Sequence, residues 1–218
     1  MKIGIVGGTG REGRGLAVRW AKAGHDVFIG SRQAEKGAAK AAELSKEFGV
    51  GIRGADNVAA CEYAELIIVT VPYGAHRPTF ESIKDAVGDK VVVDITVPLQ
   101  PPKVRSVNLP KGESAALEAR ALLGEGTRLV AALHHISSEH LSDPEHAFDC
   151  DVLVCGDDKD ARASVISLVS DLGLRGVDAG VLKNAIALES LTPVLLHINR
   201  HYKSVGSGIR ITGISETE

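Results

Sequence analysis

Short apolar runs alternate with longer, helix-like segments along most of this chain. Each run is bounded by glycine or by polar residues, a pattern that favours strands hidden from water on both faces. Such strands are expected at residues 2–6, 26–30, 51–53, 65–71, 90–95, 128–133 and 151–155, and near Val177.

The segments between these runs carry residues that favour helices. Residues 13–22 place Leu16, Ala17 and Trp20 on one helical face, and Gly24 then ends the helix. Pro193 is expected to kink the last helix or to start a new one. The further helices are expected at residues 34–48, 80–87, 113–123, 160–172 and 182–202, with a proline-rich loop at 96–111.

This order of strands and helices predicts an α/β protein with a Rossmann-type, doubly wound parallel sheet. Residues 134–149 are polar and rich in histidine, and they mark the expected domain boundary. We therefore expect a nucleotide-binding domain at residues 1–140. A small, mostly helical C-terminal domain is expected at residues 141–218.

Composition narrows the possible partners. The 218 residues carry a net charge of -3 and only 4% aromatic residues, which argues against nucleic-acid and membrane-surface partners. Three cysteines do not suggest a disulfide framework, and no apolar stretch reaches the roughly 18 residues of a membrane span. With no signal peptide evident after Met1, a cytoplasmic protein is expected.

A glycine-rich motif joins the first strand to the first helix. Gly8, Gly10 and Gly13 form a G-x-G-x-x-G pattern in the context that gives this pattern its weight. Gly8 and Gly10 are expected to let the backbone approach a pyrophosphate at the helix N-terminus, and Gly13 to let the helix pack closely. The alternative is a glycine-rich turn that binds nothing.

The end of the second strand bears on the choice of dinucleotide. NAD-specific units usually carry an acidic residue there, whereas this chain has Ser31 and Arg32, with Lys36 one helical turn later. These groups suit a 2′-phosphate through charge-assisted hydrogen bonds, and Thr9 is expected to add another. The alternative is that Arg32 and Lys36 are ordinary surface charges.

Other candidates follow later strands, where ligands of such sheets bind. Val71, Pro72 and Tyr73 follow the fourth strand, and Val97 and Pro98 follow the fifth, although both prolines are also simple strand terminators.

Histidines follow the next strand. His134 or His135 is expected to form a wall of the redox pocket, and His140 and His146 to be solvated loop residues. A metal site involving Cys150 is disfavoured because the spacing matches no zinc pattern. For residues 189–193, helix packing and a direct ligand role both remain open.

Taken together, these motifs resemble the NADPH-dependent coenzyme F420 reductases, also called F420H2:NADP+ oxidoreductases. The resemblance covers nearly the whole chain. Its matching pieces are residues 7–10, 30–32 with Lys36, 132–134, 151–158, 178–180, 189–193 and 208–209.

The resemblance implies NADP(H) and coenzyme F420 as cofactors and a hydride passed between the nicotinamide and the deazaflavin. It also implies a substrate cleft closed by the C-terminal domain at residues 141–218, and a homodimer. It places Thr9, Arg11 and Glu12 by the pyrophosphate and ribose, and Ser31, Arg32 and Lys36 by the 2′-phosphate. Tyr73, Val97 and Pro98 would lie by the nicotinamide. His134, Ser207 and Gly208 would meet the deazaflavin, and His134 would be the catalytic residue that polarises or orients its ring.

Two other functions remain open on the same scaffold. One is an NADPH-dependent reductase of a small imine, ketone or metal chelate, which would need His134 or Lys183 as a proton donor. The other is a non-catalytic, NADPH-binding sensor.

Overall fold

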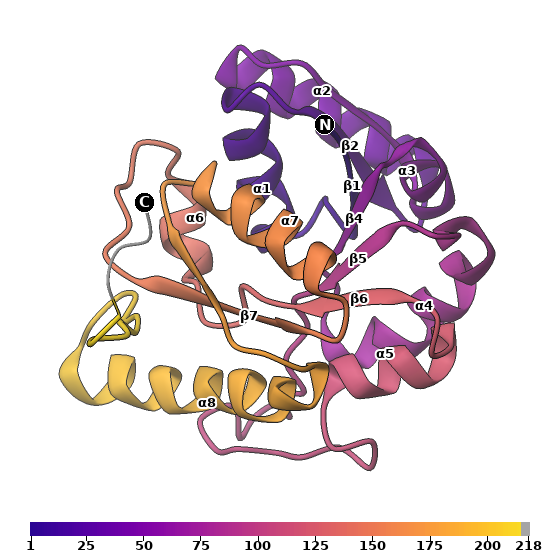
Figure 1. The fold of residues 1–218 in the computed structure, drawn as a ribbon. Helices are drawn as coiled ribbons and strands as arrows, with labels where there is room; N and C mark the ends of the chain where they lie inside the picture. The colour runs from indigo at the N-terminus through magenta and orange to yellow at the C-terminus, as the bar shows by residue number, and fades with distance from the viewer. Residues whose placement is uncertain (215–218) are drawn as a thin grey trace.

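The computed structural model describes residues 1–214, and an eight-stranded sheet forms its centre (Figure 1). The strand order is β3-β2-β1-β4-β5-β6-β7-β8, and all neighbours pair parallel except β6 and β7. This confirms the Rossmann-type, doubly wound prediction. The strands are β1 Lys2–Val6, β2 Asp26–Ser31, β3 Ile52–Asp56, β4 Leu66–Val69, β5 Val91–Asp94, β6 Arg128–Ala131, β7 Asp151–Gly156 and β8 Arg175–Asp178.

Helices cover both faces of the sheet, so its inner strands are buried as their apolar sequences predict, whereas the edge strands β3 and β8 are mostly half-buried. Leu16 and Trp20 of α1 share one core cluster with Leu168 of α7, whereas Phe80 of α4 and Leu188 of α8 belong to the cluster on the other face. The helices are α1 Arg11–Lys22, α2 Ala34–Phe48, α3 Asn57–Tyr63, α4 Tyr73–Val87, α5 Ala115–Leu123, α6 Ser138–Ser142, α7 Lys159–Ser170, the 3-10 turn η1 Leu182–Asn184 and α8 Ala185–Tyr202.

Two helices contain a proline, and Pro193 does not start a new helix, whereas the expected kink stays a prediction. Helix α4 begins at Tyr73 and continues through Pro78, and α8 is one helix from Ala185 to Tyr202 with Pro193 inside it. Each proline removes one backbone hydrogen bond. The apolar residues of each helix pack in the same core cluster as residues of the sheet, and this packing outweighs the loss of one hydrogen bond.

The C-terminal part begins with two strands and ends in α8. Strand β7 pairs antiparallel with β6 and carries β8, so the sheet runs on past the expected boundary. That boundary, between residues 140 and 141, falls inside α6, and the division into two domains stays a prediction. Among the described residues the three cysteines are free thiols, and no helix is long and apolar enough to cross a membrane.

Candidate active site

Four parallel strands end at one edge of the sheet. Strands β1, β4, β5 and β6 are neighbours, so the segments that follow them open on the same side. These segments are residues 7–10, 70–72, 95–98 and 132–135. The edge therefore gathers the glycine motif, both proline segments and the paired histidines, as the sequence predicts.

The glycine motif forms a tight turn that leaves the start of α1 open. The left-handed residue is Gly7, with φ of +74°, and not Gly8 or Gly10. A Cβ on Gly8 would lie 2.7 Å from the Cβ of Ile29, and one on Gly13 would lie 2.6 Å from Thr70 Oγ1. Gly10 caps α1 without any side-chain hydrogen bond, so the first N–H groups of the helix are available to an anion.

Side chains around this turn are exposed, and one of them has a partner. Thr9 is half-buried, whereas Arg11 and Glu12 are exposed in the first turn of α1. Arg11 Nη1 lies 2.6 Å from Glu139 Oε1 of α6. The ion pair of Arg11 thus connects the glycine turn at residues 7–10 to the segment that follows His134.

The end of β2 opens on a pocket of about 450 Å³. Ser31 is buried and Arg32 is exposed, and both line this pocket, whereas Lys36 is exposed one turn into α2 and lies outside its lining. The other lining residues are Asp56, Asn57, Val58, Gly74, Ala75, Pro78, Thr79 and Ser82.

Residues at the start of α3 line this pocket and also contact the glycine turn at residues 7–10. Asn57 Oδ1 accepts a hydrogen bond of 3.1 Å from the Gly7 N–H, and Asp56 caps α3 by accepting from Ala59 N–H. Helix α3 was not expected from the sequence, because a segment of seven residues is too short to show helical periodicity.

The segments after β4 and β5 lie against each other. Thr96 Oγ1 donates a hydrogen bond to Val71 O at 3.3 Å, and Val97 and Pro98 continue from there. Pro72 caps the N-terminus of α4, and Tyr73 is its first residue. The Tyr73 hydroxyl donates to Glu118 Oε2 at 2.9 Å, and burial raises its pKa to about 12, so this phenol stays protonated.

His134 lies buried just beyond β6. Both of its ring nitrogens are buried without a hydrogen-bond partner, and burial lowers its pKa to about 4. The Thr192 hydroxyl of α8 donates to His134 O at 2.7 Å and fixes this backbone. His135 points elsewhere, since its Nε2 lies 2.8 Å from Asp151 O.

The segment at residues 189–193 serves mainly to pack α8 on α5. Glu189 is buried and accepts hydrogen bonds from Ala115 N–H at 2.7 Å and Ala116 N–H at 3.0 Å. Burial raises the pKa of Glu189 to about 8, and the two N–H groups oppose that shift. Lys183 is exposed and forms an ion pair with Glu113.

The tail after α8 packs against the segment that follows His134. Ser207 N–H donates to Asn199 Oδ1 at 2.8 Å, and a Cβ on Gly208 would overlap with Cys150. His140 and His146 are half-buried and stack with ring centroids 3.9 Å apart, so they are less solvated than the sequence predicts. No group of metal-ligating side chains is found among the described residues.

The family model and the most similar relatives point to one family. The family model described as "NADP oxidoreductase coenzyme F420-dependent" matches residues 2–98. The F420-dependent NADP reductase of Methanothermobacter thermautotrophicus is 40% identical, over 100% of this chain and 97% of that protein. That of Methanocaldococcus jannaschii is 38% identical, over 98% and 99%. A crystal structure from Arthrobacter sp. FB24, assigned as an F420-dependent NADP reductase, has a TM-score of 0.83 and 26% identity, covering 98% of this chain and 100% of its own.

Proposed function

Because this chain belongs to the family of F420-dependent NADP reductases, we propose that it transfers a hydride between NADP(H) and the deazaflavin coenzyme F420. One observation carries the proposal for this chain. A turn in which Gly8 and Gly13 leave no room for a Cβ, and an unpartnered, buried imidazole, lie at the same sheet edge. The first suits a pyrophosphate, and the second suits a polar ring stacked nearby.

The residues present fit NADP(H). The open N-terminus of α1, with Thr9, Gly10, Arg11 and Glu12, would hold the pyrophosphate and ribose. Ser31, Arg32 and Lys36 would hold the 2′-phosphate. Asp56 also lines that pocket, and its Oδ1 already accepts the Ala59 N–H.

The nicotinamide and the deazaflavin would meet between β4, β5 and β6. Val71, Pro72, Tyr73, Val97 and Pro98 would flank the nicotinamide. His134, Ser207 and Gly208 would contact the deazaflavin. When bound, the two coenzymes supply the carbon that gives the hydride and the carbon that receives it. The protein holds the two rings in contact and excludes water.

The two side chains named as proton donors for reduction of an imine or ketone do not favour that rival. That rival needs a proton donor in the site. His134, with a pKa of about 4, is a weak source of protons near neutrality, and Lys183 is exposed and paired with Glu113. A neutral His134 is still able to orient a ring by hydrogen bonding.

Turnover with the deazaflavin tests the proposal. Purified protein is mixed with NADPH and oxidised F420, and loss of the visible absorbance of the deazaflavin is followed. We expect multiple turnovers with NADPH and little activity with NADH. Absence of turnover while NADPH still binds would contradict the proposal and favour the sensor.

The assembly implied by the family and the location expected from the sequence are also proposals. We propose a homodimer in the cytoplasm that acts on a small-molecule co-substrate, without nucleic-acid or membrane partners. Size-exclusion chromatography with light scattering tests the dimer, and a monomer at micromolar concentration would contradict it.

A further inference from the structure

A histidine–aspartate pair lies inside the protein behind the segments that would flank the nicotinamide. His76 is in the first turns of α4, and Asp94 is the last residue of β5. His76 Nε2 lies 2.7 Å from Asp94 Oδ2, and the two side chains are 1% and 0% exposed. Burying such a pair costs solvation free energy, and packed apolar residues would often be no less stable. Stability alone therefore does not account for a His76–Asp94 pair at this position.

Asp94 closes a ring of hydrogen bonds between β4, α4 and β5. Its Oδ1 accepts the Thr96 N–H at 3.0 Å, and Thr96 Oγ1 donates to Val71 O at 3.3 Å. The chain then leads from Val71 into α4, where His76 returns to Asp94. The two segments that would flank the nicotinamide are thus fixed to each other through this ring.

Asp94 also reaches toward the buried imidazole. Its backbone O accepts the Ala132 N–H at 3.4 Å, two residues before His134. The negative charge of Asp94 acts on His134, where it opposes the effect of burial on the pKa. One residue thus connects the nicotinamide side of the edge to the deazaflavin side.

We propose that His76 and Asp94 are positioning residues that hold the segment at residues 96–98 against the segment at residues 71–73, and so fix the nicotinamide plane. The identity of the bound ring rests on the proposed function. The pair should therefore strengthen binding of the nicotinamide half of the coenzyme and have no effect on binding of the adenosine half.

Two ligands separate that contribution from general stability. NADPH carries the nicotinamide, whereas adenosine 2′,5′-bisphosphate occupies only the glycine turn and the pocket by Arg32. Calorimetry with both ligands is done on the wild type, His76→Ala and Asp94→Ala. We expect the Kd for NADPH to rise about tenfold, the effect of an unsatisfied buried group, and the Kd for the bisphosphate to stay within about twofold.

Conservative variants are expected to restore the ring of hydrogen bonds through different side chains. In His76→Gln the new amide is able to donate to Asp94, and in Asp94→Asn the new amide is able both to accept from Thr96 and to bond with His76. We expect both variants to keep NADPH affinity within about threefold of the wild type. Thr96→Val, which is similar in shape and removes the bond to Val71, is expected to weaken NADPH alone.

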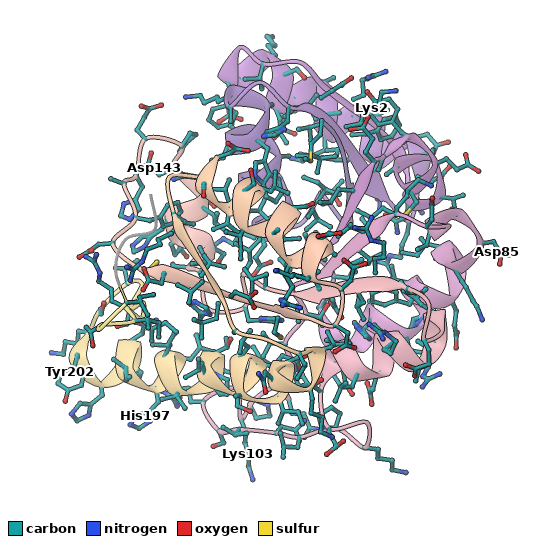
Figure 2. The ribbon with its side chains drawn as sticks, viewed as in Figure 1. Lys2, Asp85, Lys103, Asp143, His197 and Tyr202 are labelled. Atoms are coloured by element: carbon teal, nitrogen blue, oxygen red, sulfur yellow. The ribbon has the colours of Figure 1, made fainter. Side chains whose placement is uncertain are left out.

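Matched controls lie on the surface. Asp85 and His197 are exposed and project from the edge of the molecule (Figure 2), so Asp85→Asn and His197→Ala should leave both ligands unaffected. The proposal is overturned if the alanine variants lose both ligands equally or lose neither. If these variants do not fold, Thr96→Val decides, and unchanged NADPH affinity in it overturns the proposal. A wild type that binds NADPH more tightly than the bisphosphate but never reduces F420 would refute the proposed function and leave this test intact.

Discussion

At the scale of single residues, the choice of dinucleotide is proposed to depend on Arg32. Arg32 lines the pocket beside Ser31, and the end of β2 carries these two residues where NAD-specific units usually carry an acidic residue. We expect Arg32→Ala to raise the KM for NADPH by about 10- to 100-fold, the loss of a charge-assisted hydrogen bond, and to leave NADH nearly unchanged. Lys36→Ala should cost less because Lys36 lies outside the pocket lining. Equal losses for NADPH and NADH after Arg32→Ala would contradict this assignment.

His134 makes a second prediction at this scale, because its pKa is lowered from 6.5 to about 4. Between these values the unfolded chain binds a proton that the folded protein rejects. The contribution of His134 to stability is therefore complete above pH 6.5 and is lost as the pH falls toward 4, by about 3 kcal/mol. Urea unfolding of the wild type and of His134→Gln between pH 4.5 and 8 should show that the free energy of unfolding of the wild type falls relative to that of the variant as the pH falls. The same slope in both proteins would mean that other groups cause it.

At the scale of elements, local pattern was enough for most of the fold. The run at residues 2–6 and the helix at residues 34–48 were predictable to the residue, because each carries its own periodicity and its own ends. The early start of α4 before Pro78 was not, since the burial of Phe80 and its neighbours against the sheet overrides the signal of one proline. The sequence motifs also predicted which segments form the candidate site, but not the hydrogen bonds within it, such as those of Asn57 to Gly7 and of Tyr73 to Glu118.

The hydrogen bonds of Glu189 join α8 to α5, and the shifted pKa of Glu189 makes the stability of the protein depend on pH. Its pKa is raised from 4.5 to about 8, chiefly by burial, so the folded protein keeps a proton that the unfolded chain releases. This contribution to stability is present below pH 4.5 and is lost as the pH rises through about 8. Thermal unfolding of Glu189→Gln should lack that decline between pH 5 and 8. Glu62→Gln, on the exposed side of α3, is the control and should keep it.

At the scale of the whole molecule, Asp151 joins β7, β8 and the tail. Arg175 donates two hydrogen bonds to the Asp151 carboxylate, at 2.8 and 2.6 Å, and they hold its pKa below the usual range. Ile211 N–H donates to the same carboxylate, and Asp151 N–H donates to Ile209 O. These partners lie 24 to 60 residues apart in the chain, so no local pattern indicates them.

Release of that tail should therefore affect one substrate more than the other. Asp151→Ala leaves Arg175 without this carboxylate, costs about 3 kcal/mol of stability and frees the segment that carries Ser207. Trypsin should then cut faster at Lys203 and Arg210, and the KM for F420 should rise while NADPH affinity holds. Asp149→Ala removes an exposed ion pair with Arg210 and should change neither substrate. If Asp151→Ala weakened NADPH as much as F420, the tail would not act through the deazaflavin side, and Ser207 and Gly208 would have to be removed from the proposed site.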